Sequence, residues 1–260
     1  MSTFQYLTLE IAEKIAIVGL NNPPGNSLKM PLLQELDRMM DELHANPEVK
    51  VIVITGAGKT FASGADIEEI SKLTSQQQAK EMSAFGQKVF LKIENGPKPV
   101  IAAINGFCLG GGLELAMSCH MRVASDRSFM GLPEITLGII PGFGGTQRLP
   151  RIVGLSKASQ MILSGDQVRS EEALAIGLVN MVVSKDTLLD DVKKLAAKMT
   201  SKSAVAIKQA LKSMKQGASL EMAASMEVES SCFAELYNSA DMKEGVSAFL
   251  EKRKPNFQDR

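Results

Sequence analysis

Short apolar runs separated by longer amphipathic stretches make up the first two thirds of the chain. Val51–Thr55 and Val100–Ile104 are continuous apolar runs, a pattern typical of strands that are buried on both faces. Near the N-terminus, Tyr6–Leu9 and Ile15–Leu20 flank a polar turn and predict a hairpin. Further short strands are expected at Arg122–Ala124 and Val179–Val183.

Helices are predicted between these strands. The first starts near Pro31, a residue favoured in the first turn of a helix, and runs to about His44. The alternation of strands and helices argues for an α/β fold rather than α+β. The other helices expected here are Gln76–Glu94, Leu113–Ser118 and a helix that Ser170 caps and Gly177 ends.

The pattern changes character at Asp186, because helical periodicity then continues without an intervening strand. We therefore divide the chain into a core, residues 1–185, and a C-terminal helical region, residues 186–260. Such a region packs back on the core or against another subunit. Its expected helices are Asp186–Met199, Ala204–Lys215, Leu220–Tyr237 and Ala240–Lys252.

Composition and charge are those of an ordinary globular protein. The 260 residues are 45% apolar and 22% charged, which suffices for the core of one large domain. Because 29 basic residues balance 29 acidic ones, no overall field attracts nucleic acid or an anionic membrane. No apolar run reaches transmembrane length, and the N-terminal residues lack the features of a signal peptide. We expect a cytoplasmic protein with no nucleic-acid and no membrane partner.

The histidines and cysteines give no support for a metal site. His44 and His120 are the only histidines and stand far apart in the sequence. Cys108, Cys119 and Cys232 are odd in number and lack C-x-x-C spacing. A reduced compartment therefore fits better than a disulfide framework, and we expect no bound metal.

Two glycine- and proline-containing segments, Gly106–Glu114 and Gly131–Glu134, each end on a glutamate. Three consecutive glycines precede Glu114 and leave the main chain open to close approach by a ligand. If a helix starts there, its first N–H groups lack internal partners and face any negative charge that develops nearby. An anion hole beside two carboxylates suits chemistry on a thioester carbonyl.

Three other interpretations of the glycine and serine patterns fail. Gly106–Gly112 reads G-x-x-x-G-G-G rather than the G-x-G-x-x-G of a dinucleotide site. Gly58-Lys59-Thr60 resembles the end of a P-loop, but Val53 stands where its first glycine is required. No G-x-S-x-G elbow is present, and two histidines leave little scope for a Ser-His-Asp triad.

Phe61–Ile67 and Pro141–Thr146 are further segments rich in small residues. The first follows a buried strand, so either a ligand approaches its backbone or it is a tight turn. The second contains a bend and a glycine-rich start of a helix, with loop flexibility as the alternative.

Taken in order, these segments resemble the crotonase, or enoyl-CoA hydratase/isomerase, superfamily. The resemblance extends over nearly the whole chain and rests on the order and spacing of the motifs. It implies a spiral of ββα turns, a helical trimerisation region and often a hexamer built from two trimers. The matching segments are Asn21–Leu28, Phe61–Ile67, Ile104–Ala116, Pro133–Leu149 and Phe249–Phe257.

The resemblance assigns roles to particular residues. The backbone N–H groups of Ala65 and Gly111 match the pair that binds the thioester oxygen in the family. Glu114 would orient and deprotonate the water that attacks C3, and Glu134 would deliver a proton to C2. Because many isomerases keep only the second glutamate, the presence of both indicates hydration. No metal, flavin or nicotinamide is implied, and coenzyme A enters as part of the substrate.

Other residues match the family's contacts with coenzyme A. The backbone from Ala62 to Ile67, with Ala65 and Asp66, would surround the adenine end. Gly142 could place another N–H near the attacking water. Lys59, together with Phe249 and Lys252 from a neighbouring subunit, are candidates for the adenosine phosphates and ring, although for the lysines solvated surface charge is the alternative.

The sequence departs from the family pattern at two places. Pro23-Pro24-Gly25 occupies the first loop, where many relatives carry a basic residue near the coenzyme A phosphate. His120 stands where many hydratases have an aspartate, and we assign it a structural role. Leu28, Met30, Met82, Phe85 and Phe143 are candidates for the lining of the acyl pocket.

The predicted function is hydration of a trans-2-enoyl-CoA to a 3-hydroxyacyl-CoA by a trimer or a dimer of trimers. The alternative enzymes are a Δ3,Δ2-enoyl-CoA isomerase and a branched-chain enoyl-CoA hydratase. An alternative from another class is an acyl-CoA- or RNA-binding protein with vestigial catalysis.

Overall fold

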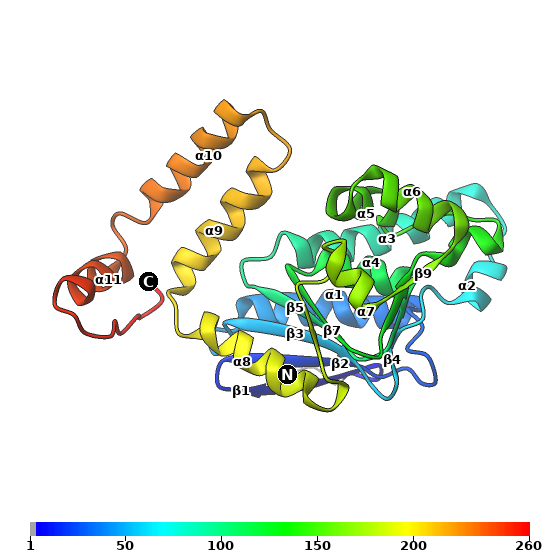
Figure 1. The fold of residues 1–260 in the computed structure, drawn as a ribbon, viewed down its shortest axis with the longest axis horizontal. Coiled ribbons are helices and arrows are strands. Elements are labelled where there is room, and N and C mark those ends of the chain that lie inside the picture. Colours follow the sequence, from blue (N-terminus) through cyan, green and yellow to red (C-terminus); the bar gives the residue numbers. More distant parts are fainter. Residues whose placement is uncertain (1–3) are drawn as a thin grey trace.

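The computed structural model describes residues 4–260 (Figure 1). It contains two sheets, and from β3 onward the strands of the two sheets largely alternate along the chain. The larger sheet has the order β1-β2-β3-β5-β7-β10 and the smaller β4-β6-β8-β9. Strands of the larger sheet are β1 Leu7–Ala12, β2 Ile15–Leu20, β3 Val51–Gly56, β5 Val100–Ile104, β7 Met121–Ser125 and β10 Met181–Val183. Strands of the smaller sheet are β4 Thr60–Ala62, β6 Phe107–Leu109, β8 Phe129–Gly131 and β9 Gln167–Arg169.

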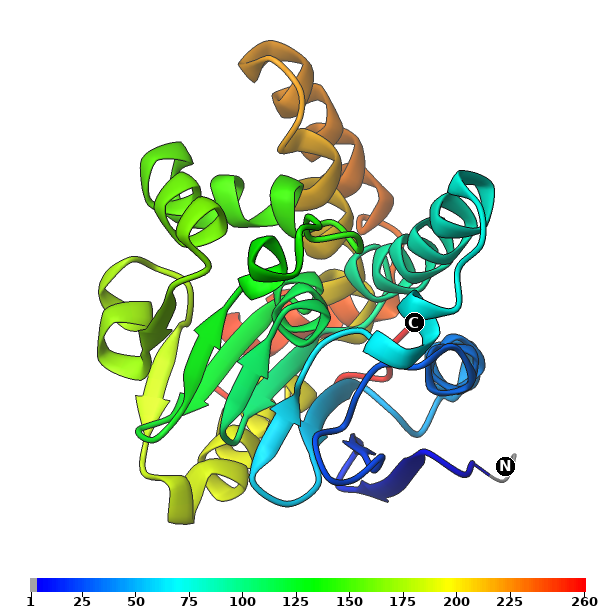
Figure 2. The same cartoon turned by 90° about the vertical axis from the view of Figure 1, so that its right-hand side faces the viewer.

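Each turn of the fold uses one strand from each sheet. β3, β5 and β7 lie parallel in the larger sheet, and β4, β6 and β8, which follow them in the chain, lie parallel in the smaller one. Helices then return the chain to the next turn: α3 (Gln76–Glu94) after β4 and α4 (Gly111–Ser118) after β6. This repetition is the predicted spiral of ββα turns, seen from a second direction in Figure 2.

Alternate residues of the central strands face two different helical layers, as the period of a β-strand requires. Ile52 and Ile54 of β3 belong to the main core, which contains residues of α3, α4 and α1 (Met30–Ala45). Val51 and Val53 pack instead with α8 (Leu188–Thr200) on the other face of the sheet. α8 lies in the predicted C-terminal helical region, residues 186–260, and covers this face of the sheet.

The last three helices leave the core. α9 (Ala204–Gly217) and α10 (Met222–Glu235) form a pair that projects from it in Figures 1 and 2, and α11 (Ala240–Leu250) lies beyond them. Among the described residues, α9 buries none and α10 buries only Cys232. Large apolar side chains are exposed here, including Phe233 at 77% and Phe249 at 82%.

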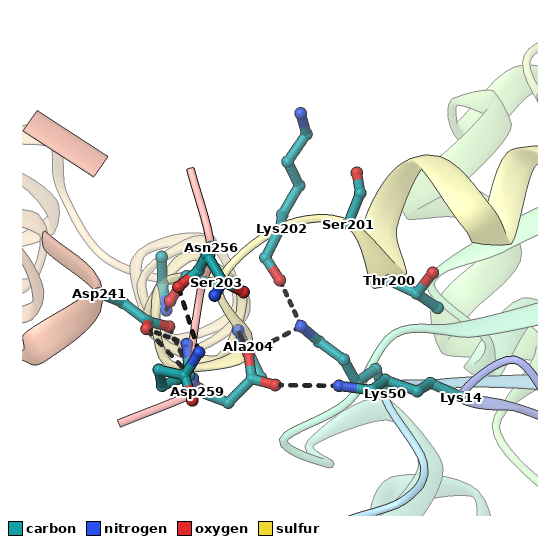
Figure 3. A network of polar contacts seen from close by, with 12 residues as sticks. Lys14, Lys50, Thr200, Ser201, Lys202, Ser203, Ala204, Asp241, Asn256 and Asp259 are labelled. Atoms are coloured by element: carbon teal, nitrogen blue, oxygen red, sulfur yellow. Dashed lines mark hydrogen bonds and ion pairs between the residues drawn. The ribbon is translucent and has the colours of Figure 1, made fainter. Parts of the chain in front are cut away.

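The end of the chain ties this helical region to the core. Lys50 Nζ pairs with Asp259 Oδ1 at 2.7 Å and donates to the Lys202 carbonyl at 2.6 Å (Figure 3). Asp241 Oδ1, at the start of α11, accepts the N–H groups of Gln258 and Asp259 at 2.6 and 3.1 Å. These bonds fix the C-terminal segment between α11 and the start of β3.

Ser170 does not cap the helix for which it was predicted. The helix, α7 (Ser170–Ala175), is preceded by Arg169 at the cap position. The buried Ser170 hydroxyl instead donates to the Ser125 carbonyl at 2.6 Å and joins the turn after β7 to the helix. Gly177 follows α7 with φ +75°, which confirms it as the helix end.

Several elements were missing from the predicted pattern. The strands of the smaller sheet have three residues each, too few to show a periodicity. Asp186–Met199, predicted as one helix, is divided into η2 (Lys185–Thr187) and α8. The other elements not predicted are α2 (Ile67–Ser71), the 3₁₀-helix η1 (Pro133–Leu137) and α6 (Leu155–Ser164), and of α5 (Gly145–Val153) only a glycine-rich start was expected.

Candidate active site

The consecutive glycines form the start of α4, a helix whose eight residues are all buried. A side chain at Gly112 would overlap the Ala62 carbonyl oxygen, so only glycine allows the helix to approach β4 this closely. A Cβ placed on Gly111 would lie 3.2 Å from the Ala65 nitrogen. The structure therefore brings Ala65 and Gly111, the two predicted donors, into adjacent positions. As the first residue of α4, Gly111 has no acceptor for its N–H within the helix.

Glu114 lies in the first turn of α4 and is 1% exposed. Its Oε1 accepts the N–H of Phe143 at 2.8 Å and that of Gly145 at 2.6 Å. Gly145 is the first residue of α5, so the carboxylate also faces the positive end of a second helix. These contacts favour the ionised form of a side chain that is otherwise removed from water.

Glu134 approaches from η1, where Pro133 starts the 3₁₀ turn. A Cβ placed on Gly110 would lie 3.0 Å from Glu134 Oε1, so this carboxyl group rests against the glycine segment. Its Oε2 is buried and has no hydrogen-bond partner among residues 4–260. A carboxyl oxygen in that setting suits a protonated group that can donate to a ligand.

Burial and the charge of Glu134 raise the pKa of Glu114 to about 7, although the Gly145 and Phe143 N–H groups act in the opposite direction. Burial also raises the pKa of Glu134 above its ordinary value. Both carboxyl groups of this neighbouring pair therefore bind a proton more tightly than an ordinary glutamate does. Because the two groups interact, their protons are shared by the pair, and the singly protonated state can provide a base and an acid together.

Both glutamates, Ala65 and Gly111 line a cavity of about 800 Å³. Much of the wall is apolar and comes from α2, α3 and the segment after η1. This composition suits an acyl chain attached to a polar reacting group. The large apolar side chains of the wall are Ile67, Ile70, Leu73, Met82, Leu137, Ile139, Ile140 and Phe143.

The predicted acyl-pocket residues divide into two groups. Met82 and Phe143 line the cavity as expected. Leu28 is fully buried in the core, while Met30 and Phe85 are partly buried against it, and none of the three is part of the cavity wall. Leu28 pairs with Ala65 in an isolated parallel bridge, so it helps to fix the backbone of Ala65 without facing the cavity.

Gly142 lines the cavity but does not start a helix, because α5 begins at Gly145 after the cap residue Gly144. Its carbonyl oxygen accepts bonds from Ser83 Oγ at 2.6 Å and Gln87 Nε2 at 2.8 Å, both from α3. The N–H groups that reach Glu114 belong to Phe143 and Gly145, which sequence reasoning did not identify. The glycine-rich segment was the only signal that could have indicated them.

The predicted coenzyme A contacts lie at different distances from this cavity. Ile67 lines it, whereas Asp66 caps α2 by accepting the Glu69 N–H at 3.2 Å. Ala62 is buried in β4, and Lys59 is exposed in the turn before it. Phe249 and Lys252 lie in and just after α11, which Figure 1 shows on the opposite side of the molecule from α2. They do not reach the cavity of their own chain.

His120 accepts the Val100 N–H on Nδ1 at 3.0 Å and so joins the start of β5, as its predicted structural role requires. In the described part of the chain no helix is long and apolar enough to cross a membrane. No cluster of three potential metal ligands occurs among the same residues.

The chain is similar to known proteins in both sequence and structure. Residues 10–260 match the family model described as enoyl-CoA hydratase/isomerase. A crotonyl-CoA hydratase of Syntrophomonas wolfei is 44% identical over 98% of each chain. A short-chain-enoyl-CoA hydratase of Clostridium acetobutylicum is 42% identical over 95% of each. The crystal structure of an enoyl-CoA hydratase from Bacillus anthracis superposes with a TM-score of 0.94 at 33% identity, over 98% of this chain and all of that one.

Proposed function

Since the chain belongs to the enoyl-CoA hydratase/isomerase family, we propose that it is an enoyl-CoA hydratase, which adds water to a trans-2-enoyl-CoA and yields a 3-hydroxyacyl-CoA. The observation that carries the proposal is the position of Glu114 and Glu134 on one cavity with Ala65 and Gly111. A member specialised for isomerisation needs only one carboxyl group there, whereas hydration uses two.

The N–H groups of Ala65 and Gly111 bind the thioester oxygen of the substrate. When water adds to C3, negative charge moves through C2 to this oxygen, and an enolate forms. Donors that are fixed before the reaction stabilise this charge at no cost of reorganisation, and one such donor is typically worth about 10²–10³ in turnover. The adjacency of the two positions supports this role.

The two carboxyl groups provide the proton transfers. Ionised Glu114, held by the N–H groups of Phe143 and Gly145, takes a proton from water as the C3–O bond forms. Protonated Glu134 gives its proton to C2, and the C=C π electrons end in the new C2–H bond. Proton exchange between the pair and solvent then restores the starting state. The addition involves no redox change, so the cycle is written without a cofactor.

Coenzyme A would leave the cavity past Ala62–Ile67, with Lys59 near its phosphates. Phe249 and Lys252 would complete this part of the site from a neighbouring subunit of a trimer. The exposed apolar side chains of α10 and α11 support such an assembly, because a monomer would leave them in water. Sedimentation should give a mass that is a multiple of three chains, and a monomer at micromolar concentration would contradict the shared site.

The function is tested by following the loss of enoyl-thioester absorbance with crotonyl-CoA, in parallel with a medium-chain enoyl-CoA. We expect rapid loss and a 3-hydroxyacyl-CoA identified by mass spectrometry, and the ratio of rates indicates the preferred chain length. Binding of acyl-CoA without turnover of either substrate would contradict the proposal.

A further inference from the structure

We propose that Arg148 and Glu94 are positioning residues, which hold segment 142–145 so that its N–H groups stay on the Glu114 carboxylate. The proposal rests on the proposed function and adds two residues that do not touch the substrate. Neither side chain lines the cavity. Their effect would be transmitted entirely through the backbone of the segment.

Arg148 links the segment to α3 through a nearly buried guanidinium group, 9% exposed. Its Nη1 donates to the Phe143 carbonyl at 2.9 Å. Its Nε and Nη2 donate to Glu94 Oε2 at 3.1 and 2.9 Å. The planar guanidinium group can serve both acceptors at once because its donors point in fixed, different directions.

The peptide groups on both sides of Phe143 are therefore anchored. The Gly142 carbonyl, bound by Ser83 and Gln87 of α3, belongs to the same planar peptide group as the Phe143 N–H that reaches Glu114. The next peptide group is held at the Phe143 carbonyl by Arg148. Release of Arg148 would leave the second peptide group free to rotate and would loosen the N–H groups on either side of it.

Glu94 is also bound from the C-terminal helical region. Lys215 of α9 pairs with Glu94 Oε1 at 2.5 Å, so one carboxylate joins α3, α5 and α9. Burial alone would raise the pKa of Glu94, but the hydrogen bond from Lys215 and the charge of Arg148 lower it overall. Glu94 thus stays ionised at neutral pH and retains both cationic partners.

Arg148→Lys tests the proposal because it keeps the positive charge but removes the planar guanidinium group, whose donors serve both acceptors. A lysine can reach Glu94 or the Phe143 carbonyl, but not both in the same geometry. We expect kcat to fall about 10- to 100-fold, with KM within about threefold of wild type, since small displacements of catalytic groups are costly. The pH profile should also move to higher pH, because Glu114 loses hydrogen bonds that favour its ionised form.

Glu94→Gln is the second variant, and the direction in which it shifts the pKa of Glu114 distinguishes two explanations. The charged groups acting on Glu114 are Glu134 from η1 and Arg148 from α5. If Glu94 acted only by its own negative charge, its removal would lower the pKa of Glu114. Loss of the N–H groups that Arg148 and Glu94 position would instead raise the pKa of Glu114. Arg151→Lys is the matched control, because Arg151 lies on the same helix but, within residues 4–260, binds only Gln147. The kcat of this variant should stay within about twofold of wild type.

A readout without substrate separates this proposal from the proposed function. The infrared carboxyl band of Glu114, assigned by its loss in Glu114→Gln, gives a titration midpoint for each variant. A higher midpoint in Arg148→Lys or Glu94→Gln supports positioning even if no enoyl-CoA is hydrated. An unmoved or lower midpoint in folded variants overturns the proposal, whatever happens to kcat.

Discussion

Glu114 on α4 accepts the Gly145 N–H at the start of α5 at 2.6 Å, so two helix N-termini meet at one buried carboxylate. The Glu134 carboxyl group on the same cavity has no comparable support, since its Oε2 lacks a partner among residues 4–260. The backbone N–H groups of Phe143 and Gly145 thus favour ionised Glu114, while burial and the charge of Glu134 raise its pKa to about 7. In the hydratase cycle proposed above, the ionised form of Glu114 is the base and Glu134 is the acid.

Replacement of Glu114 by glutamine should remove the base and keep the shape of the site. We expect kcat for crotonyl-CoA to fall about 10²- to 10⁴-fold, the usual contribution of a positioned acid or base. Acyl-CoA binding, measured by calorimetry with a saturated analogue, should persist. Wild-type turnover in this variant would exclude the role assigned to Glu114.

Replacement of Glu134 by glutamine should suppress hydration and also the exchange of the C2 proton. Both steps use the same proton donor, so their rates should fall together. Deuterium uptake at C2 of a saturated acyl-CoA, followed by mass spectrometry, measures the exchange separately. If exchange continues at the wild-type rate, another group protonates C2.

The site should also make stability depend on pH. In the unfolded chain Glu114 has the ordinary glutamate pKa of about 4.3, whereas in the folded protein it is raised to about 7. The folded protein therefore binds this proton more tightly, and stability falls as pH rises between these two values. The loss should reach about 3 kcal/mol above pH 7.

Glu114→Gln isolates this contribution, because its side chain does not titrate. The free energy of unfolding of the variant relative to wild type should increase from pH 4 to pH 8, as measured by denaturant titration. A difference that is constant over this range would show that the Glu114 pKa is the same in the folded and unfolded protein.

The sequence predicted the parts of the site that follow directly from local motifs. The glycines before Glu114, the proline before Glu134 and the loop at Ala65 each lie within one short segment, and the structure brings them onto one cavity. The larger strands and most helices followed from hydrophobic periodicity. The three-residue strands of the smaller sheet did not, because so few residues show no period.

The contacts that support the site come from residues distant in sequence. Glu94 and Arg148 meet only because the fold brings the end of α3 near α5, and each alone looks like an ordinary surface charge. The start of α5 was expected near Gly142, about one turn before its actual first residue, Gly145. A glycine-rich run does not show which of its residues starts the helix. Such relationships depend on tertiary packing and cannot be obtained from periodicity.

Gly86 of α3 is another such residue, and its replacement by alanine gives the last prediction. The glycine is buried inside a helix, where alanine would normally be favoured by about 1 kcal/mol. A Cβ at this position would, however, overlap the Phe143 ring, which also packs edge-on against Phe90. Gly86→Ala should displace Phe143 together with its N–H, lower kcat and destabilise the fold by about 1–3 kcal/mol. Gly217→Ala in α9 is the control, because its Cβ would meet Ser225 at an ordinary 3.4 Å, so turnover should stay unchanged and stability should not fall but rise by up to about 1 kcal/mol. Thermal unfolding and crotonyl-CoA kinetics measure both effects, and a stabilised, fully active Gly86→Ala would show that the Phe143 ring does not hold the segment at Glu114.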